Sequence, residues 1–229
     1  MSNDVISHNE MCRREGVSLQ RGMNFGLRGN HSVILASVRP NSPYADRLED
    51  EGSTLIYEGH DHPRGVASPN PKLLDQPEFL PSGRPTENGK FHAAAQAFKR
   101  GQRPPERVRV YENLKKGIWS YNGVFHLVDS WVERDGHRAV FKFKLVAVES
   151  DENFDLPARP SAEHRRLIPT EVKVKVWKRD GGRCQECGAT DELHFDHVLP
   201  FSLGGSSITA ENVQLLCARH NIAKSNKII

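Results

Sequence analysis

The sequence lacks any long apolar run and any strong excess of one charge. No stretch approaches the roughly 20 apolar residues of a membrane helix, which excludes a spanning protein, and we expect no membrane partner. The first 14 residues lack the apolar core of a secretory signal, so the expected location is the cytoplasm. With 32 Lys and Arg against 29 Asp and Glu, the charge permits a nucleic-acid partner without demanding one.

Cysteine is also scarce, with four in 229 residues. In a chain without a secretory signal, cysteines are more often metal ligands or free thiols than disulfides. Cys12 stands far from the other three, and we interpret it as a lone buried or free thiol. The hydrophobic content of 37% suffices for real cores, and the length suits one large domain or two modest ones.

The chain divides into three zones. Residues 1–150 show strand-like patterning with many turn signals. Residues 151–168 combine prolines and charges with few apolar residues, which is typical of a linker. Residues 169–229 contain three of the four cysteines. We therefore predict an N-terminal domain, a linker and a C-terminal domain with these bounds.

The N-terminal zone predicts a mostly antiparallel sheet with few helices. Residues 124–132 and 140–148 are rich in β-branched and aromatic side chains, and Asp135-Gly136 between them is a hairpin signal. Asn122-Gly123 is a second turn signal, and the alanine-rich run 91–100 predicts a helix. In the C-terminal zone we expect a helix over 169–179, a strand over 193–198 and a helix over 210–224, with Thr209 as its N-cap.

Two ligand pairs, Cys184-x-x-Cys187 and Cys217-x-x-His220, predict a metal site. Cys217 and His220 would share one face of the predicted helix, so both could point at the same ion. Three sulfurs and one imidazole suit a closed, tetrahedral, structural zinc site, which leaves no open position for chemistry.

Between and beyond these pairs stand Asp196, His197, Asn212, Asn221 and Lys224. Residues 193–227 resemble the HNH endonuclease family, because the following features occur in family order: Asp196-His197, Pro200, Gly204-Gly205, Asn212, Leu215-Leu216-Cys217 and Asn221-x-x-Lys224. The third residue that gives the family its name is Asn221 here instead of His, which makes that metal ligand an amide oxygen.

The resemblance implies a role for each of these residues. Asp196 and Asn221 would hold one catalytic divalent ion, such as Mg²⁺ or Mn²⁺, through oxygen ligands. His197 would accept a proton from the attacking water, because imidazole titrates near neutrality. Asn212 would tie the intervening loop together and orient His197, and Lys224 would contact a DNA phosphate.

Residues 20–150 resemble the SRA (SET-and-RING-associated) family, which flips a modified cytosine out of DNA. The resemblance is carried, in chain order, by residues 30–36, 44–59, Asp75-Gln76, Asn88 with the alanine-rich helix, 108–110 and 121–125. The Tyr-Asp-Gly that names the family is Tyr-Asn-Gly here. Together the two resemblances imply an α+β chain: a twisted, barrel-like, mostly antiparallel β domain with a few helices, followed by a small ββα-metal domain with a structural zinc.

The SRA resemblance also implies a pocket for the flipped base. Tyr57 falls on the second of two stacking tyrosines, and Tyr44 is the nearest counterpart of the first, after a one-residue shift. That shift leaves the carboxylate that reads the base open between Asp46 and the acidic run 49–51, and we favour Asp46. A carboxylate accepts a hydrogen bond from the cytosine amino group, which uracil-like edges do not offer.

The sequence therefore predicts a modification-dependent restriction endonuclease that acts on double-stranded DNA with 5-methylcytosine or another 5-modified cytosine. Two alternatives remain open: a modified-DNA reader with a non-catalytic zinc module, and an HNH nuclease indifferent to modification. One catalytic site per chain means that cutting both strands requires a homodimer, two recruited copies or sequential nicks.

Overall fold

The computed structural model describes residues 4–28, 30–39, 41–63, 70–148, 168–199 and 205–224. The predicted linker lies outside these residues except for Ile168, and so do Pro200 and Gly204. Within the described ranges, no helix is both long enough and apolar enough to cross a membrane.

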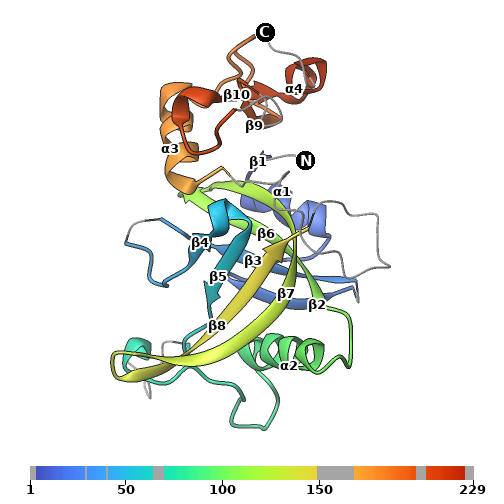
Figure 1. Ribbon diagram of the computed structural model, residues 1–229, viewed down its shortest axis with the longest axis vertical. Coiled ribbons are helices and arrows are strands. Elements are labelled where there is room, and N and C mark those ends of the chain that lie inside the picture. The colour runs from blue at the N-terminus through green and yellow to red at the C-terminus, as the bar shows by residue number, and fades with distance from the viewer. Residues whose placement is uncertain are drawn as a thin grey trace.

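An eight-stranded, strongly twisted sheet forms the N-terminal module (Figure 1). The strand order is β2-β3-β6-β7-β8-β5-β4, β1 pairs with β7, and all pairs are antiparallel except β3 with β6. This confirms the mostly antiparallel α+β fold class. The strands are β1 (Val5–Ile6), β2 (Met23–Leu27), β3 (His31–Ala36), β4 (Arg47–Glu49), β5 (Thr54–Glu58), β6 (Glu106–Lys115), β7 (Ile118–Asp135) and β8 (Arg138–Ala147).

The two turn signals have different outcomes. Asp135 is the last residue of β7 and Gly136 follows it into the tight turn before β8, so this hairpin prediction is confirmed. The prediction of a turn at Asn122-Gly123 is wrong, because both residues lie inside β7. There Val110 pairs with Gly123 and Tyr111 pairs with Tyr121, which leaves Asn122 as the extra residue of a β-bulge. Gly123 has φ +95°, a value that side-chain-bearing residues rarely adopt.

Helix α2 (Glu87–Lys99) covers one face of this sheet and confirms the predicted alanine-rich helix. The Thr86 side chain caps it by accepting from the Gly89 amide. Phe91, Ala94 and Ala95 recur at helical spacing and enter the main core with the sheet. The remaining short elements of the module are α1 (His8–Glu15), η1 (Asp50–Gly52) and η2 (Pro71–Leu73).

The C-terminal module contains α3 (Thr170–Arg179), β9 (Leu193–His197), η4 (Ala210–Asn212), β10 (Val213–Cys217) and α4 (Ala218–Lys224). The predicted strand and first helix are confirmed within a residue. The single helix predicted over 210–224 is wrong, because its first half is η4 and β10. β10 pairs antiparallel with β9, with Leu215 opposite Phe195, and both side chains are buried. This pairing outweighs the helix propensity of the run, and Thr209 makes no side-chain cap.

Candidate active site and base-recognition site

Cys184, Cys187, Cys217 and His220 converge, with one ligand atom from each within 4.8 Å of all the others. The Cys187 and Cys217 sulfurs are 3.8 Å apart, and His220 Nδ1 is 3.4 Å from the sulfurs of both Cys184 and Cys217. Zn–S bonds of about 2.3 Å and Zn–N bonds of about 2.1 Å in a tetrahedron place ligand atoms about 3.5–3.8 Å apart. The cluster therefore has the geometry of a zinc site.

The two halves of the cluster come from different local structures. Cys184 and Cys187 lie in the turn after α3, whereas Cys217 ends β10 and His220 lies in the first turn of α4. Cys217 and His220 thus meet across a strand–helix junction instead of on one helix face. Burial raises the pKa of the Cys184 thiol, but the amides of Cys217, Cys187 and Glu186 and the His220 ring lower it to about 6. At pH 7 this thiol is mostly the thiolate that a metal requires.

Asp196 and Lys224 form an ion pair at the end of β9. The Lys224 ammonium donates to the Asp196 carboxylate and to the His197 carbonyl, and its side chain is 2% exposed. The sequence predicts that Lys224 contacts a DNA phosphate, but the Lys224 side chain is buried in this structure. The Lys224 ammonium therefore lies between two oxygen acceptors, the Asp196 carboxylate and the His197 carbonyl. Asn221 stands three residues before Lys224 on α4, on the same helix face.

The His197 imidazole is held in place by Ser207, a residue that the sequence analysis did not single out. His197 Nε2 lies 2.8 Å from Ser207 Oγ, and the Ser207 side chain is buried. Burial lowers the pKa of His197, the adjacent Asp196 raises it, and Lys224 lowers it, with a net decrease. The ring is therefore neutral at pH 7, the state in which it can accept a proton.

Asn212 connects the two sides of the loop that brings Ser207 to His197. Its Oδ1 accepts from the Leu199 amide at 2.8 Å, and its Nδ2 donates to the carbonyls of Leu199 and Ser206 at 3.0 Å. Gly205 fits here because a Cβ would lie 1.9 Å from the Leu199 carbonyl oxygen. In the structure, Asn212 therefore reaches His197 indirectly, by fixing the backbone next to Ser207.

In the N-terminal module the predicted pocket residues gather where β4 begins and β5 ends. Asp46 Oδ2 accepts from the Ser37 amide at 2.9 Å, and Oδ1 accepts from the Glu58 amide at 3.0 Å. Burial raises the pKa of Tyr57, and the charges of Asp46, Tyr44 and Glu58 raise it further. Tyr57 is 3% exposed within the main core, so neither ring face is open to a base in this structure.

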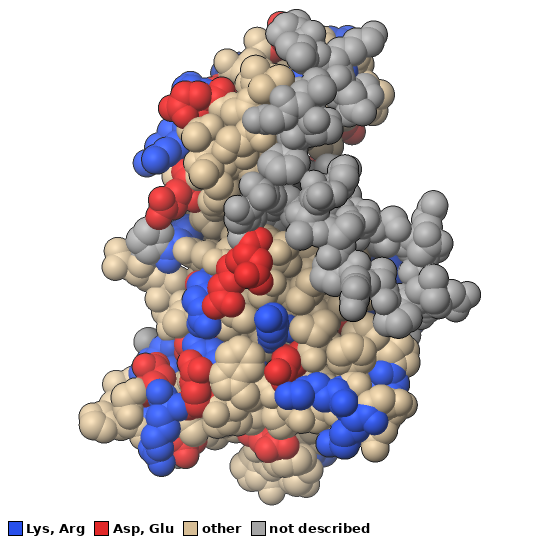
Figure 2. All heavy atoms as spheres, in the orientation of Figure 1, with Lys and Arg blue, Asp and Glu red and all other residues tan. Residues whose placement is uncertain are grey.

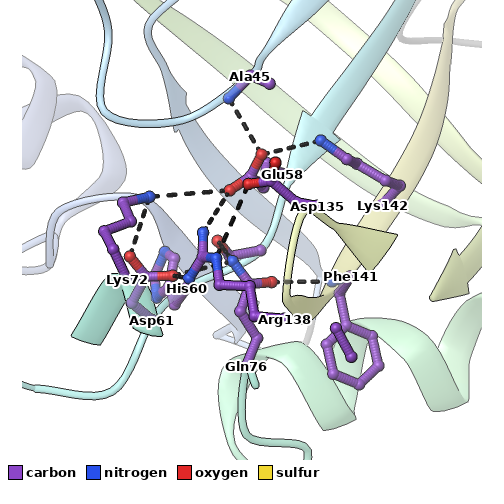
Figure 3. Close-up of polar contacts among 12 residues, drawn as sticks. Ala45, Glu58, His60, Asp61, Lys72, Gln76, Asp135, Arg138, Phe141 and Lys142 are labelled. Atoms are coloured by element: carbon purple, nitrogen blue, oxygen red, sulfur yellow. Dashed lines mark hydrogen bonds and ion pairs between the residues drawn. The ribbon is translucent and has the colours of Figure 1, made fainter. Parts of the chain in front are cut away.

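A buried charge network next to these residues was not foreseen (Figure 3). Glu58 accepts from Lys142 at 2.9 Å and from Arg138 at 3.1 Å, and it also accepts from the Ala45 amide at 3.1 Å. Lys72 Nζ lies 3.0 Å from Asp61 and 4.0 Å from the centre of the Tyr44 ring. The network fixes the backbone at Ala45, between Tyr44 and Asp46, and places a cation against one face of Tyr44.

A comparison with models of protein families agrees with the HNH resemblance. A model described as HNH endonuclease matches residues 184–227, which contain the zinc cluster, Asp196, His197 and Asn221. None of the curated proteins compared with the chain matches it. The chain is similar to several solved structures, and the two SUVH5 SRA complexes quoted first cover 66% and 65% of it.

The crystal structure of the SUVH5 SRA domain with hemimethylated CG DNA is 23% identical, with a TM-score of 0.46 and 89% of that chain covered. The SUVH5 SRA complex with fully methylated CG DNA is 22% identical, with a TM-score of 0.44 and 90% covered. Arabidopsis thaliana SUVH6 with SAM is 19% identical, with a TM-score of 0.43, and the match covers 86% of this chain and 31% of that one. Because these likenesses are low, the function of the N-terminal module has to be inferred from its own residues.

Proposed function

We propose that this chain is a modification-dependent DNA endonuclease. Its N-terminal module, which we call the reader, binds duplex DNA with 5-methylcytosine or another 5-modified cytosine by flipping that base. Its C-terminal module, the nuclease, hydrolyses a nearby phosphodiester with a single divalent ion. One observation carries the proposal: a neutral, Ser207-held His197 beside the Asp196 carboxylate, within a Cys₃His frame matched by the HNH endonuclease model.

Each residue of the nuclease has a chemical task in this proposal. His197 takes the proton of a water molecule that attacks phosphorus, and the bond from phosphorus to the leaving sugar oxygen breaks. Asp196 and Asn221 would hold the divalent ion, which neutralises charge on the phosphate and the leaving oxygen. For the divalent ion to bind there, Lys224 must either release the Asp196 carboxylate or share it with the ion. Cys184, Cys187, Cys217 and His220 would hold zinc, which keeps the fold and leaves the chemistry to the other residues.

The surface charge favours recognition through a pocket over bulk attraction to phosphates. On the face drawn in Figure 2, basic and acidic side chains of the described residues are interspersed. The net charge is only +3. A protein of this kind gains little affinity from counterion release and depends more on the base that it captures. Selective cutting of modified DNA would serve restriction of foreign DNA.

Matched plasmids test the proposed function. One sequence is prepared unmodified, with 5-methylcytosine and with 5-hydroxymethylcytosine, and each is incubated with the full chain and Mg²⁺, Mn²⁺, Co²⁺ or Ni²⁺. We expect cleavage of at least one modified form and none of the unmodified plasmid. Equal cutting of all three would show a nuclease indifferent to modification, and binding of modified DNA without cutting in any metal would show a reader only.

Replacing Ser207 tests how His197 is held. Ser207→Ala removes the hydroxyl at Nε2, and loss of one hydrogen bond worth about 1.4 kcal/mol lowers the cleavage rate about tenfold. Single-turnover cleavage, DNA affinity and melting temperature are measured together, and only the first should change. Ser206→Ala is the matched control, because that hydroxyl bonds only the neighbouring Ile208 amide in the described contacts. Equal rates for the two variants would remove Ser207 from the site.

The titration of Asp46 tests which carboxylate reads the base. Burial raises the pKa of Asp46 to about 7, despite the amides of Ser37 and Glu58 that lower it. The carboxylate that accepts from the cytosine amino group therefore forms as pH rises, and affinity for modified DNA should rise roughly tenfold from pH 6 to pH 8. Protonation of histidines gives the opposite trend, because it strengthens phosphate binding at low pH.

Fluorescence anisotropy with modified and unmodified duplexes measures this dependence. Asp46→Asn should bind modified DNA weakly, and its affinity should no longer increase with pH. Glu49→Gln is the control from the acidic run, since Glu49 pairs only with Arg47 among the ion pairs of the described residues. If Glu49→Gln loses the pH dependence and Asp46→Asn keeps it, the assignment to Asp46 is wrong.

A further inference from the structure

The reader and the nuclease share one hydrophobic core. Leu114 of β6, Ile118 of β7 and Val5 of β1 pack in the same cluster as Val172 and Val176 of α3. The cluster continues through the nuclease sheet to the zinc ligands, with Leu193, Phe195, Val213, Leu215, Leu216, Cys184 and Cys217. Figure 1 shows α3 and β9 directly against the end of the reader where β1 and β6 lie.

A fully buried ion pair crosses the same contact. Lys173 of α3 donates to Glu112 of β6 at 3.0 Å and to Asn122 of β7 at 2.8 Å, and neither Lys173 nor Glu112 has any exposed side-chain surface. Asn122 donates to Glu112 at 2.9 Å, and the Thr170 hydroxyl also donates to Glu112. Burial raises the pKa of Glu112, but Lys173 and these hydrogen bonds lower it overall, so Glu112 is a carboxylate at pH 7.

Strand β1 adds a second connection. Val5 and Ile6 pair with Ser120 and Trp119 of β7, and the preceding Asp4 forms an antiparallel bridge with His194 of β9. Asp4 Oδ1 lies 2.7 Å from His194 Nδ1. The first strand of the chain thus touches both sheets, and the nuclease is fixed by contacts at two separate points as well as by the shared core.

We infer that the nuclease is held rigidly on the reader, so that cleavage falls at a fixed distance from the captured base, and that Glu112 and Lys173 set this register. A buried ion pair specifies geometry well, because any displacement leaves a desolvated charge without its partner. His197 lies on β9, which belongs to the shared core, so its position relative to the base pocket follows from the same contacts. The inference rests on the proposed function for its cleavage readout.

Two measurements on the full chain test the inference. Sequencing of the ends cut from a duplex with one modified cytosine should place most wild-type ends at one position on a given strand. Calorimetry of the zinc-loaded chain should show one cooperative transition for both modules. Lys173→Ala should spread the ends over several nucleotides and separate the transition into two. Lys175→Ala, an exposed position on the same helix, should behave as wild type.

The outcomes separate the inference from the proposed function. Wild-type ends scattered over many positions, or two wild-type transitions, would overturn rigid coupling while leaving a modification-dependent nuclease intact. A Lys173→Ala variant that folds and keeps both the single position and the single transition would overturn the role of the ion pair. Should Lys173→Ala fail to fold, the wild-type measurements still decide on coupling. A wild type that never cuts modified DNA would refute the proposed function, and calorimetry would still test the shared core.

Discussion

His197→Ala is expected to abolish cleavage of modified DNA while leaving DNA binding and zinc content unchanged. A positioned general base contributes about 10²–10⁴-fold to a rate. The other histidine of β9, His194, is paired with Asp4. The substitution removes a half-buried ring whose only side-chain hydrogen-bond partner among the described residues is Ser207, so the fold loses little. Single-turnover cleavage of a modified duplex, with anisotropy for binding, measures the two effects separately.

Chemical rescue makes this test sharper. Imidazole added to the His197→Ala protein can enter the space left by the ring and should restore part of the cleavage rate, whereas added imidazole should not accelerate the wild type. His137→Ala serves as the control for loss of a histidine, because His137 is exposed in the β7–β8 turn of the reader. A His197→Ala protein that cuts at the wild-type rate would refute the mechanism.

Sequence reasoning succeeded where the chemistry is local. Spacing alone identified the four residues of the Cys₃His cluster, since two pairs three residues apart need only a turn and a junction to converge. It failed where long-range pairing decides. The run 213–217 can form a helix or a strand by itself, and only its pairing with β9 selects the strand. Lys142 alternates with Phe141 and Phe143 as a solvent-facing residue would, yet it is buried because Glu58 lies opposite.

The role of the Tyr-Asn-Gly sequence depends on an element that is distant in the chain. Asn-Gly is typical of a hairpin turn. Here Gly123 forms a bulge, and the bulge directs Asn122 into the ion pair between the modules. An amide suits that place because it accepts from Lys173 and donates to Glu112 at once, whereas a second carboxylate would only accept. The sequence does not reveal that α3 packs on β6 and β7, so sequence reasoning has no ground for selecting Asn122, Glu112 or Lys173.

The second large effect is expected from the zinc ligands. Cys184→Ser should unfold the nuclease, remove the bound zinc and abolish cleavage. Structural zinc contributes about 10–16 kcal/mol of apparent binding energy in small zinc domains, and a module of this size can build only a small core of its own. Cys184 is also part of the core shared by the two modules, so loss of zinc should weaken their coupling as well. Metal analysis, circular dichroism and limited proteolysis report zinc content, folding and the surviving fragment.

Cys12→Ser is the matched control for this prediction. Cys12 lies on α1, outside the metal cluster, and accepts only a weak bond from the Leu19 amide at 3.4 Å and a contact with His8 at 3.7 Å in the described part of the chain. The Cys12→Ser protein should keep one zinc per chain and the wild-type melting temperature. Removing zinc from the wild type with a chelator should reproduce the Cys184→Ser result, and adding Zn²⁺ back should reverse it, whereas Mg²⁺ should not. A Cys184→Ser protein with one tightly bound zinc and an unchanged transition would show that Cys184 is needed neither for zinc binding nor for folding of the nuclease.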